Sequence, residues 1–521
     1  MALELFGDFG FVGGSDEPAD PYQNAQRCIN WYPEGSPSQS AKVPAALLGC
    51  PGLVQLCTAP GGGAPGFSPS MSAWPQPSAV TNLPVRGLWV LPGRTQALAV
   101  IGGVAYLVTQ GAIAPNGFPS LSLSQVGVLA SNSGPVCIRD NGFGGYAVIV
   151  DGLNGYFYNV ASQAFTQITD PAFYGANRVA FIDGWWIFNK PNSPIFYTNY
   201  PQYGTGFAGS YYALKDAWSD NLVAVIENKE ELWLIGEQTT EIWYDAGGQY
   251  FPFQRLVGTL LQGGCKAAQT VCQVSHGGED SLIWFGRNIQ GENTIVRTKG
   301  FAWQVISTPA VSDAIAKYTV TSDAFAYTYQ EDTHEFYVIT FPTADRTWVC
   351  DLTLPAAYAW HERLSYDPYA DAWHRHRSNC YMNFAGMRIV GDYQNGALYQ
   401  LTRSAYTDAG WPIRAVRRSP YIWNAQNRER VFMSQLQVDF RLGQGNASGM
   451  GNNPQAKLRL SRDYGATYGS SVQAPMGAIG QTTNRCIWRR LGFSRGAVAE
   501  IEVIDPVNRD IAGATLRAVG P

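Results

Sequence analysis

The chain has 521 residues and a formal net charge of −4. At about 150 residues per domain, this length predicts about three units, or one large all-β unit with attachments. Aromatic residues make up 13% of the chain and charged residues only 15%, with 56 Gly and 31 Pro. This composition favours short strands joined by turns and argues against long surface helices rich in Glu and Lys. No run of about 18 apolar residues occurs, so a membrane-spanning helix is excluded.

The N-terminus and the cysteines indicate where the protein matures. The first residues, MALELFGDFGFVGGSDEPADPY, contain neither a basic region nor a sustained apolar core, so no targeting segment is expected. Nine Cys residues are scattered along the chain without a C-x-x-C pair. An odd count without metal-ligand spacing predicts reduced, mostly buried thiols in a protein that matures in a cytoplasm.

Strand-sized apolar runs recur along the chain, each built from an apolar strand, a Gly, Asp or Asn turn and an aromatic-rich strand. They lie at residues 87–108, 145–160, 178–197, 222–244, 281–305, 324–350 and 387–401. A spacing of about 40 to 50 residues, with four short strands per unit, is typical of a β-propeller. About six blades are expected, with seven as the next count. The tryptophans expected in the blade cores are Trp89, Trp185, Trp186, Trp233, Trp243 and Trp284.

A hairpin within residues 231–265 is the clearest local element. Leu232 to Ile235 is continuously apolar, Ile242 to Tyr244 is apolar and aromatic, and Gly236 to Thr240 supplies turn residues. This pattern predicts a β-hairpin with buried strands. Three glycines that follow it are expected to allow close backbone approach: Gly258, Gly263 and Gly264.

Two regions depart from the repeat. Residues 60–84 are rich in Gly, Pro and Ser and predict an irregular loop or extended arm. After Trp423, longer alternating strands predict a separate small β-sandwich. The expected domains are an extended N-terminal segment at 1–84, a propeller at 85–425 and a sandwich-like docking domain at 426–521, with a hinge between Arg414 and Arg430.

The charge is unevenly distributed. Residues 401–521 carry 16 Lys and Arg against 8 Asp and Glu, whereas the first 400 residues carry 20 against 32. One interpretation is ordinary surface variation, with Arg side chains covering apolar edges. The other is a basic docking face for an acidic protein surface or for nucleic acid.

Two motifs suggest catalysis or metal binding, but their context argues against both. Gly492 to Gly496 fits the G-x-S-x-G nucleophile elbow, which needs a following helix and a later His base. A strand-like run follows instead, and the last His is His376, so a tight turn is predicted. A cluster of His and Cys matches no closed zinc spacing and predicts a surface loop; its members are His361, His374, His376 and Cys380.

Residues 461–468 resemble an Asp-box, in which a carboxylate bonds backbone N–H groups across a turn and Gly takes a positive φ. Such a box supports β structure rather than catalysis. A glycosidase would need two carboxylates facing one cleft. Sequence alone brings none of the candidates together: Asp183, Glu227, Glu230, Glu231 and Asp323. Neither a Walker-type loop nor a strand-anchored G-x-G-x-x-G is present, so no cofactor, no metal and no catalytic residue is predicted.

Long ordered segments resemble the tail-nozzle, or packaged-DNA stabilisation, proteins of short-tailed phages. They are NAQRCINWYPE at 24–34, LLGCPGLVQL at 47–56, LWLIGEQTTEIWYDAGGQYFPFQRLVGTLLQGGCKAAQTV at 232–271, and SLIWFGRN and GENTIVRTKGFAWQVISTPAVSDAI between 281 and 315. The C-terminal IWRRLGFSR and EIEVIDP are similar to the ends of related tail proteins. Residues 60–84 and the loop at 443–454 have no counterpart in this resemblance.

The resemblance implies a structural, non-enzymatic virion protein made in the bacterial cytoplasm. Its subunits would form a hexameric ring below the portal and its adaptor ring, extend the DNA-exit channel, and help retain and then eject the genome. Tail fibres or tailspikes and a needle or plug would be further neighbours, and double-stranded DNA would pass without sequence recognition. An acidic body suits a conduit, because each Lys or Arg contact to phosphate adds affinity.

The basic C-terminal part would dock on the adaptor or on a neighbouring subunit. The interface residues predicted for this role are Arg414, Arg417, Arg418, Arg428, Arg430, Arg485, Arg489, Arg490 and Arg495. The alternative is a carbohydrate-binding or glycoside-hydrolysing propeller, such as a receptor-recognition protein. A ring several times the mass of the chain favours the nozzle, and a monomer that releases sugar from glycans favours the alternative.

Overall fold

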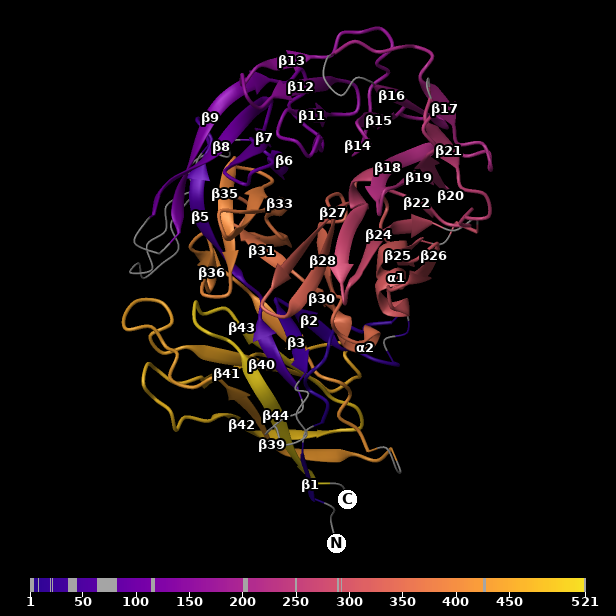
Figure 1. Ribbon diagram of the computed structural model, residues 1–521. Helices are drawn as coiled ribbons and strands as arrows, with labels where there is room; N and C mark the ends of the chain where they lie inside the picture. The colour runs from indigo at the N-terminus through magenta and orange to yellow at the C-terminus, as the bar shows by residue number, and fades with distance from the viewer. Residues whose placement is uncertain are drawn as a thin grey trace.

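Short strands dominate the fold, as the apolar and aromatic runs between Gly and Asp turns predict. The computed structural model describes residues 4–7, 9–18, 20, 22–35, 45–62, 82–113, 118–199, 205–248, 251–287, 290–291, 293–424 and 428–519. Its strands form a β-propeller and, below it in Figure 1, a β-sandwich. The predicted all-β fold, a propeller followed by a C-terminal sandwich, is confirmed.

Four blades are separate antiparallel meanders of four strands each. The first two contain β6 (Val85–Val90), β7 (Gln96–Ile101), β8 (Val104–Ile113) and β9 (Pro119–Val128), then β10 (Cys137–Asp140), β11 (Tyr146–Val150), β12 (Gly155–Asn159) and β13 (Phe165–Gln167). The next two contain β14 (Val179–Ile182), β15 (Trp185–Asn189), β16 (Ile195–Asn199) and β17 (Tyr212–Leu214), then β18 (Leu222–Asn228), β19 (Glu231–Gly236), β20 (Thr240–Asp245) and β21 (Phe253–Arg255).

Two further blades carry the few helical turns of the described chain. The fifth contains β22 (Gly264–Cys265), β23 (Cys272–His276), β24 (Glu279–Arg287), β25 (Asn293–Lys299) and β26 (Ala302–Val305), with the 3-10 turn η1 (Ala268–Thr270) between β22 and β23. The sixth contains β27 (Phe325–Glu331), β28 (His334–Phe341), β29 (Arg346–Asp351) and β30 (Trp360–Glu362). The helices α1 (Pro309–Ala316) and α2 (Ala356–Ala359) precede β27 and β30.

The seventh blade closes the ring with a strand from the N-terminal part of the chain. It pairs β33 (Ser378–Phe384), β34 (Met387–Asp392) and β35 (Ala397–Thr402) with β5 (Gly52–Thr58), and β36 (Thr407–Asp408) and β37 (Trp411–Pro412) extend it. A short hairpin of β31 (Leu364–Asp367) and β32 (Ala372–Arg375) precedes it. The described chain therefore forms seven blades, against an expected count of about six. Because this blade is split along the sequence, its periodicity does not show as one complete unit.

The blades surround one axis, with β6, β14, β18, β27 and β33 on the inner side and β9, β13, β17, β21 and β26 at the rim (Figure 1). Neighbouring blades pack through buried apolar layers, and the predicted tryptophans lie there. Trp186, Trp233 and Trp284 are fully buried, and Trp185 and Trp243 nearly so. Trp89 is only half-buried and faces the axial cavity described below.

One continuous nine-stranded sheet joins the propeller to the sandwich. It runs from the sixth blade through β2 (Arg27–Ile29) and β38 (Ala415–Arg418) to β43 (Val498–Val503), β40 (Gln455–Ser461) and β41 (Val472–Pro475). β2 is the bridging strand, parallel to β30 and antiparallel to β38. Because backbone hydrogen bonds cross the junction, the two domains are joined by more than a linker.

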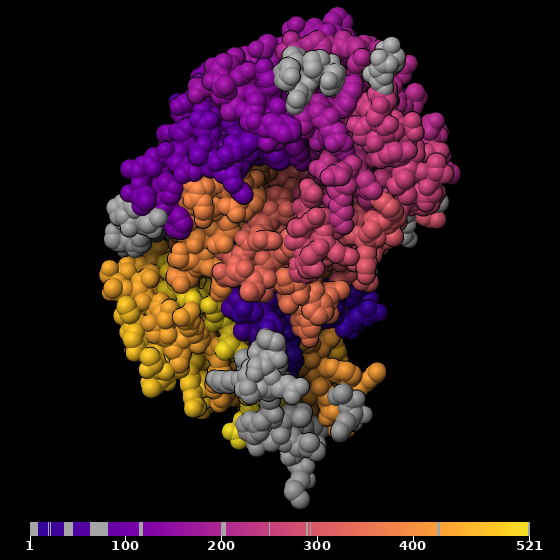
Figure 2. All heavy atoms as spheres, viewed as in Figure 1, coloured from indigo at the N-terminus to yellow at the C-terminus, as the bar shows by residue number. Residues whose placement is uncertain are grey.

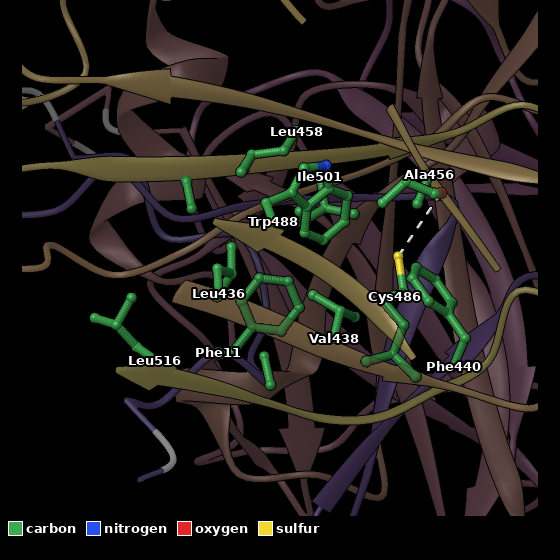
Figure 3. Packing of buried hydrophobic residues seen from close by; sticks show 14 of the residues in the cluster. Phe11, Leu436, Val438, Phe440, Ala456, Leu458, Cys486, Trp488, Ile501 and Leu516 are labelled. Carbon is green, nitrogen blue, oxygen red and sulfur yellow. Dashed lines mark hydrogen bonds between the residues drawn. The ribbon is translucent and has the colours of Figure 1, made fainter. Parts of the chain in front are cut away.

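The second sandwich sheet covers the first. It contains β3 (Trp31–Gly35), β4 (Ala45–Gly49), β44 (Ile511–Val519), β39 (Val431–Phe440) and β42 (Cys486–Ser494), with β1 (Glu4–Gly7) on β44. Figure 3 shows Leu436 and Trp488 from this sheet packed toward Leu458 and Ile501 of the other. Alternate residues point into this core on either side of a bulge between Met433 and Gln435 of β39, so the period of two predicted for half-buried strands is observed in both halves.

The N-terminal segment supplies strands to both domains. Within residues 1–84, expected as an extended arm, β1, β3 and β4 belong to the sandwich, β2 to the junction and β5 to the propeller. The irregular loop predicted at 60–84 lies mostly outside the described residues. The predicted hinge at 414–430 begins with β38, a strand in the middle of the nine-stranded sheet. Hydrophobic patterning could not reveal these pairings, because they join segments hundreds of residues apart.

The hairpin predicted from residues 231–265 is present as β19 and β20. Gly264 follows it at a point of close backbone contact, where an added Cβ would lie 2.3 Å from the Gln238 nitrogen. Gly263 is equally confined, since its Cβ would meet the Trp303 ring at 2.7 Å. Gly258 has open space around it but a φ of +89°, which favours glycine for another reason.

All nine cysteines are free thiols, and six of them are buried. The prediction of reduced, mostly buried thiols is confirmed. No helix in the described part of the chain is long and apolar enough to cross a membrane.

Candidate functional site

The basic surplus of the C-terminal part lies mainly on the surface of the sandwich. Six of the nine predicted interface arginines are exposed, and they lie in or beside β39 and β42: Arg428, Arg430, Arg485, Arg489, Arg490 and Arg495. β42 is the last strand of its sheet in the described chain, so it presents an open edge. We call these six residues the sandwich arginines.

Two exposed aromatic rings accompany the sandwich arginines. Phe432 and Phe493 are 56% and 48% exposed and stack on each other across β39 and β42, with centroids 6.2 Å apart. The Arg430 guanidinium lies 5.0 Å from the Phe493 ring centroid. Arginine and aromatic side chains together are enriched at protein–protein interfaces. The surface therefore has the composition of a docking site for a protein.

The other three predicted interface arginines lie on the domain junction, and two of them, Arg414 and Arg418, are already ion-paired. Arg414 Nε donates to Glu502 at 2.6 Å, and Arg418 Nε donates to Glu500 at 2.7 Å. Arg459 also donates to Glu500, so this carboxylate holds two arginines. Burial raises the pKa of Glu500, but the hydrogen bond and charge of Arg418, with the charge of Arg459, outweigh it and hold the pKa below its ordinary value.

Arg417 is fully buried in the nine-stranded sheet. Its guanidinium donates to the Phe11 carbonyl at 2.6 Å, to the Gly14 carbonyl at 2.8 Å and to the Gln26 side chain. Its side chain therefore ties the N-terminal segment to β38 and is not free to reach a partner. The sequence could not distinguish Arg417 from Arg418, because burial of the first depends on contacts with residues 11–26.

In the G-x-S-x-G segment, Gly492 to Ser494 end β42, and the predicted turn follows at Arg495 and Gly496. Ser494 ends β42 and donates its hydroxyl hydrogen to the Arg462 carbonyl, and β43 begins at Val498. Gly492 has a φ of +81°. A strand therefore follows the serine where a nucleophile elbow needs a helix.

The four residues of the His/Cys cluster lie at separate positions in the fold. His361 is buried, His374 contacts Asp345 at 2.8 Å, and His376 is buried with its Nδ1 2.6 Å from Ser378 Oγ. The surface loop predicted for the cluster is therefore wrong. His361 and His376 lie in or beside strands packed against the propeller core, His374 lies in β32, and Cys380 lies in β33 with its thiol directed at the Val85 carbonyl. In the described residues, no three His, Cys, Asp or Glu side chains are arranged to hold a metal.

The Asp-box has the predicted geometry. Asp463 accepts hydrogen bonds from the Thr467 backbone and hydroxyl at 2.9 and 2.6 Å and from the Ser461 hydroxyl at 2.7 Å, and Gly465 has a φ of +86°. These bonds lower the pKa of Asp463 to about 2, with that of the Thr467 hydroxyl foremost. The box closes the turn after β40 and has a conformational role.

The candidate glycosidase carboxylates are distributed over several turns and strands. Asp183 and Glu230 lie in strand-connecting turns at positive φ. Burial and the charges of Asp245 and Glu230 raise the pKa of Asp183. Glu227 accepts a bond from the Glu230 backbone, and Asp323 lines the cavity on the propeller axis.

That axial cavity is a feature that sequence reasoning missed. It has a volume of about 600 Å³ and is lined by residues of the inner strands β6, β10, β23, β27 and β33. Four arginines reach it, from blades far apart in the chain: Arg86, Arg139, Arg178 and Arg375. No local motif links these positions, so only the closed ring brings them together.

Family models match both domains in order. A model described as Bacteriophage P22 Gp10, beta-propeller, matches residues 102–406, and one described as Bacteriophage P22 Gp10, beta-sandwich, matches residues 415–519. Together they cover well over half of the chain. No curated protein shows significant similarity.

Solved structures share a general likeness in fold. PorZ, a surface component of the type-IX secretion system of Porphyromonas gingivalis, is 11% identical, with a TM-score of 0.36 over 70% of this chain and 44% of its own. The N-terminal domain of Nup159 is 9% identical, with a TM-score of 0.40 over 73% and 99%. The extracellular domain of BT4673 from B. thetaiotaomicron is 9% identical, with a TM-score of 0.39 over 78% and 48%. The chain spans less than half the length of the first of these.

Proposed function

The chain belongs to the bacteriophage P22 Gp10 family of structural virion proteins, and from this premise we propose that it is a subunit of the phage tail nozzle. In this role it extends the DNA-exit channel below the portal and adaptor, helps to retain the packaged genome, and conducts it outward on ejection. The observation that carries the proposal is the ordered match of both family domains along the chain.

The fold supports a mechanical role. The nine-stranded sheet carries backbone hydrogen bonds from the sixth blade into the sandwich, so force on one domain passes to the other through the sheet. The ion pairs of Arg27 with Glu362, Arg414 with Glu502 and Arg418 with Glu500 reinforce the same strands. A tail part that bears the load of a pressurised genome needs this kind of connection.

The charge distribution supports the orientation of the subunit. The acidic first 400 residues avoid gripping phosphate, since each Lys or Arg contact would add salt-dependent affinity for DNA. The sandwich arginines with Phe432 and Phe493 form the face that docks on the adaptor ring or a neighbouring subunit. Homo-oligomerisation into a hexameric ring and contacts with other tail proteins belong to this proposal.

Electron microscopy of virions tests the proposal as a whole. We expect density for the propeller and sandwich as a six-fold ring at the tail, and recombinant protein incubated with the adaptor should form particles carrying six copies of the 56.9 kDa chain. Virions that lack this density, or a recombinant chain that never joins the adaptor, would contradict it.

Charge reversal tests the docking face. The triple substitution Arg489→Glu, Arg490→Glu and Arg495→Glu should weaken assembly onto the adaptor, most strongly at low salt, because screening reduces the contribution of exposed charges. Lys299→Glu, exposed at the end of a propeller strand, is the matched control and should assemble normally. Normal assembly of the triple variant at every salt concentration would remove this face from the proposal.

A further inference from the structure

The axial cavity of the propeller is independent of the docking face and has the properties of a binding site. Its volume of about 600 Å³ lies in the range of small-molecule pockets. Aromatic and amide side chains line it together with the arginines: Trp89, Phe325, Tyr327, Tyr381, Gln269, Gln273 and Asn379. In Figure 2 the propeller face is recessed where the purple N-terminal blades meet the orange C-terminal ones.

One of the four arginines there serves the fold. Arg86 donates to the carbonyls of Gly134, Gly102 and Ser131 and to the Ser131 hydroxyl, which in turn bonds Asp151. Its hydrogen-bonding capacity is largely filled by the protein. Arg86 therefore has a structural role and is not one of the ligand-binding residues.

Unlike Arg86, Arg139, Arg178 and Arg375 use only part of their hydrogen-bonding capacity within the protein. Arg139 donates to the Ile138 carbonyl and stacks on Trp89, with its guanidinium carbon 4.4 Å from the ring centroid. Arg178, only 6% exposed, donates to Gln269 and Val271 but leaves its Nε buried without a partner.

Arg375 stacks on Tyr393 at 3.9 Å and leaves its Nη1 buried without a partner. Burial lowers the pKa of Arg375, although Tyr393 and nearby carboxylates act in the opposite direction. Burial also lowers the pKa of Arg139, and the charge of Arg178 lowers it further. The arginines thus face one cavity closely enough for two of them to repel each other.

The three arginines, Arg139, Arg178 and Arg375, have no direct ion-pair partner among the described residues. Asp323 is the one carboxylate among the lining residues; its Oδ2 accepts from the Thr343 backbone and its Oδ1 is buried without a hydrogen-bond partner, so it offsets one of the three positive charges at most. Buried cations without a paired anion are costly, and folded proteins neutralise or pair them.

We propose that the axial cavity binds a small oxyanion, a phosphate or carboxylate group held by Arg139, Arg178 and Arg375. Guanidinium groups recognise both anions through charge-assisted hydrogen bonds. Trp89 and Phe325 also line the cavity and accommodate the flat or apolar body of a molecule that carries the group. The ligand contacts blades one, two and six, Arg178 beside β14 of blade three and Arg375 of the β31–β32 hairpin, and so stabilises the closed ring.

Thermal unfolding and calorimetry of the full chain test this site with two probes, sodium phosphate and sodium acetate. Sodium chloride at equal ionic strength is the reference. We expect phosphate, acetate or both to raise the melting temperature saturably and to bind with a stoichiometry of one, and the probe that acts identifies the chemical source of the oxyanion.

Arg139→Met with Arg375→Met is the decisive variant. It should melt at or above the wild-type temperature without added anion, because it removes two half-buried charges that have no ion-pair partner, and it should bind the anion about tenfold more weakly or worse. Arg94→Met, in an exposed turn of the first blade, should behave as wild type. An anion response equal in all three proteins, or no response to either probe in the wild type, would overturn the proposal.

Discussion

Two arginines, one fully buried and one half-buried, show how the same side chain behaves in two regions of this molecule. Arg417, at the domain junction, is fully buried and donates to two backbone carbonyls and a glutamine side chain. Arg375, beside the propeller axis, stacks on Tyr393 and leaves a nitrogen without a partner. The junction is a completed hydrogen-bond network, and the axis is an incomplete one.

The hydrogen-bond partners of the guanidinium group, rather than its burial alone, therefore separate a structural arginine from a binding arginine. A buried cation whose hydrogens are all used by the protein holds the fold together, and its removal leaves orphaned acceptors. A buried cation with unused hydrogens costs stability until something accepts them. Substitutions at the two positions should therefore have opposite consequences.

The largest expected effect is at the junction. Arg417→Met should lower the free energy of unfolding by about 3 to 5 kcal/mol, because it leaves the buried carbonyls of Phe11 and Gly14 without a donor. Urea unfolding measures this change. Arg441→Met, on an exposed strand end of the sandwich, is the control; a loss below about 1 kcal/mol for Arg417→Met would contradict the structural role.

The next largest loss of stability is expected at Glu500, which pairs with Arg418 and Arg459 at the junction. Glu500→Gln should cost about 1.5 to 3 kcal/mol, since hydrogen bonds to charged groups are lost. The folded-state pKa of Glu500 is lowered, so its stabilisation is present above the ordinary pKa near 4.5 and is lost as pH falls through the folded value. Unfolding at pH 7 and pH 3.5 should show the variant's deficit shrinking at the lower pH.

Acid should also weaken the propeller through His376. Burial, followed by the charges of Arg363, Arg377 and Arg375, lowers the pKa of His376 to about 3. The unfolded chain binds a proton there below about pH 6.5, so the free energy of unfolding falls by up to about 1.4 kcal/mol per pH unit on acidification. His376→Asn should show a shallower decline between pH 6.5 and 4.5, and an unchanged slope would show that another group controls it.

The smallest change in stability is expected at the propeller axis, and it gives the clearest contrast with the domain junction. Arg375→Met alone should leave the free energy of unfolding within about 0.5 kcal/mol of wild type or raise it, because the lost side chain gives up stacking but removes an unpaired charge. Chemical unfolding in anion-free buffer measures this. A loss as large as that of Arg417→Met would erase the contrast between junction and axis.

Much of the local structure could be predicted from the sequence. The hairpin of β19 and β20, the Asp-box around Asp463 and the turn after Ser494, whose hydroxyl accepts from the Gly496 N–H, rest on contacts within a few residues. The order of propeller and sandwich followed from the change in strand pattern after Trp423. The sandwich arginines followed from a charge count, and six of the nine predicted residues are indeed exposed.

The remaining features depend on distant pairings. Arg417 meets the Phe11 carbonyl across 406 positions in the chain, and Asn30 bonds the Leu364 carbonyl across 334. β5 completes the seventh blade beside β35. Arg139 and Arg375 lie far apart in the chain and line one cavity only because the ring of blades closes. None of these positions carries a local signal that separates it from its neighbours.

The sequence by itself determined the strand content, the turns, the order of the two domains and the family resemblance. Alternation of apolar and polar residues specifies which face of a strand is buried, and Gly and Asp specify where it turns. Only the tertiary structure decided which strands share a sheet, how many blades close the ring, and which arginines are satisfied, exposed or left facing a cavity. The physical reason is that strand partners and the desolvation of a charge are set by groups remote in the chain, whereas periodicity reports only on neighbours.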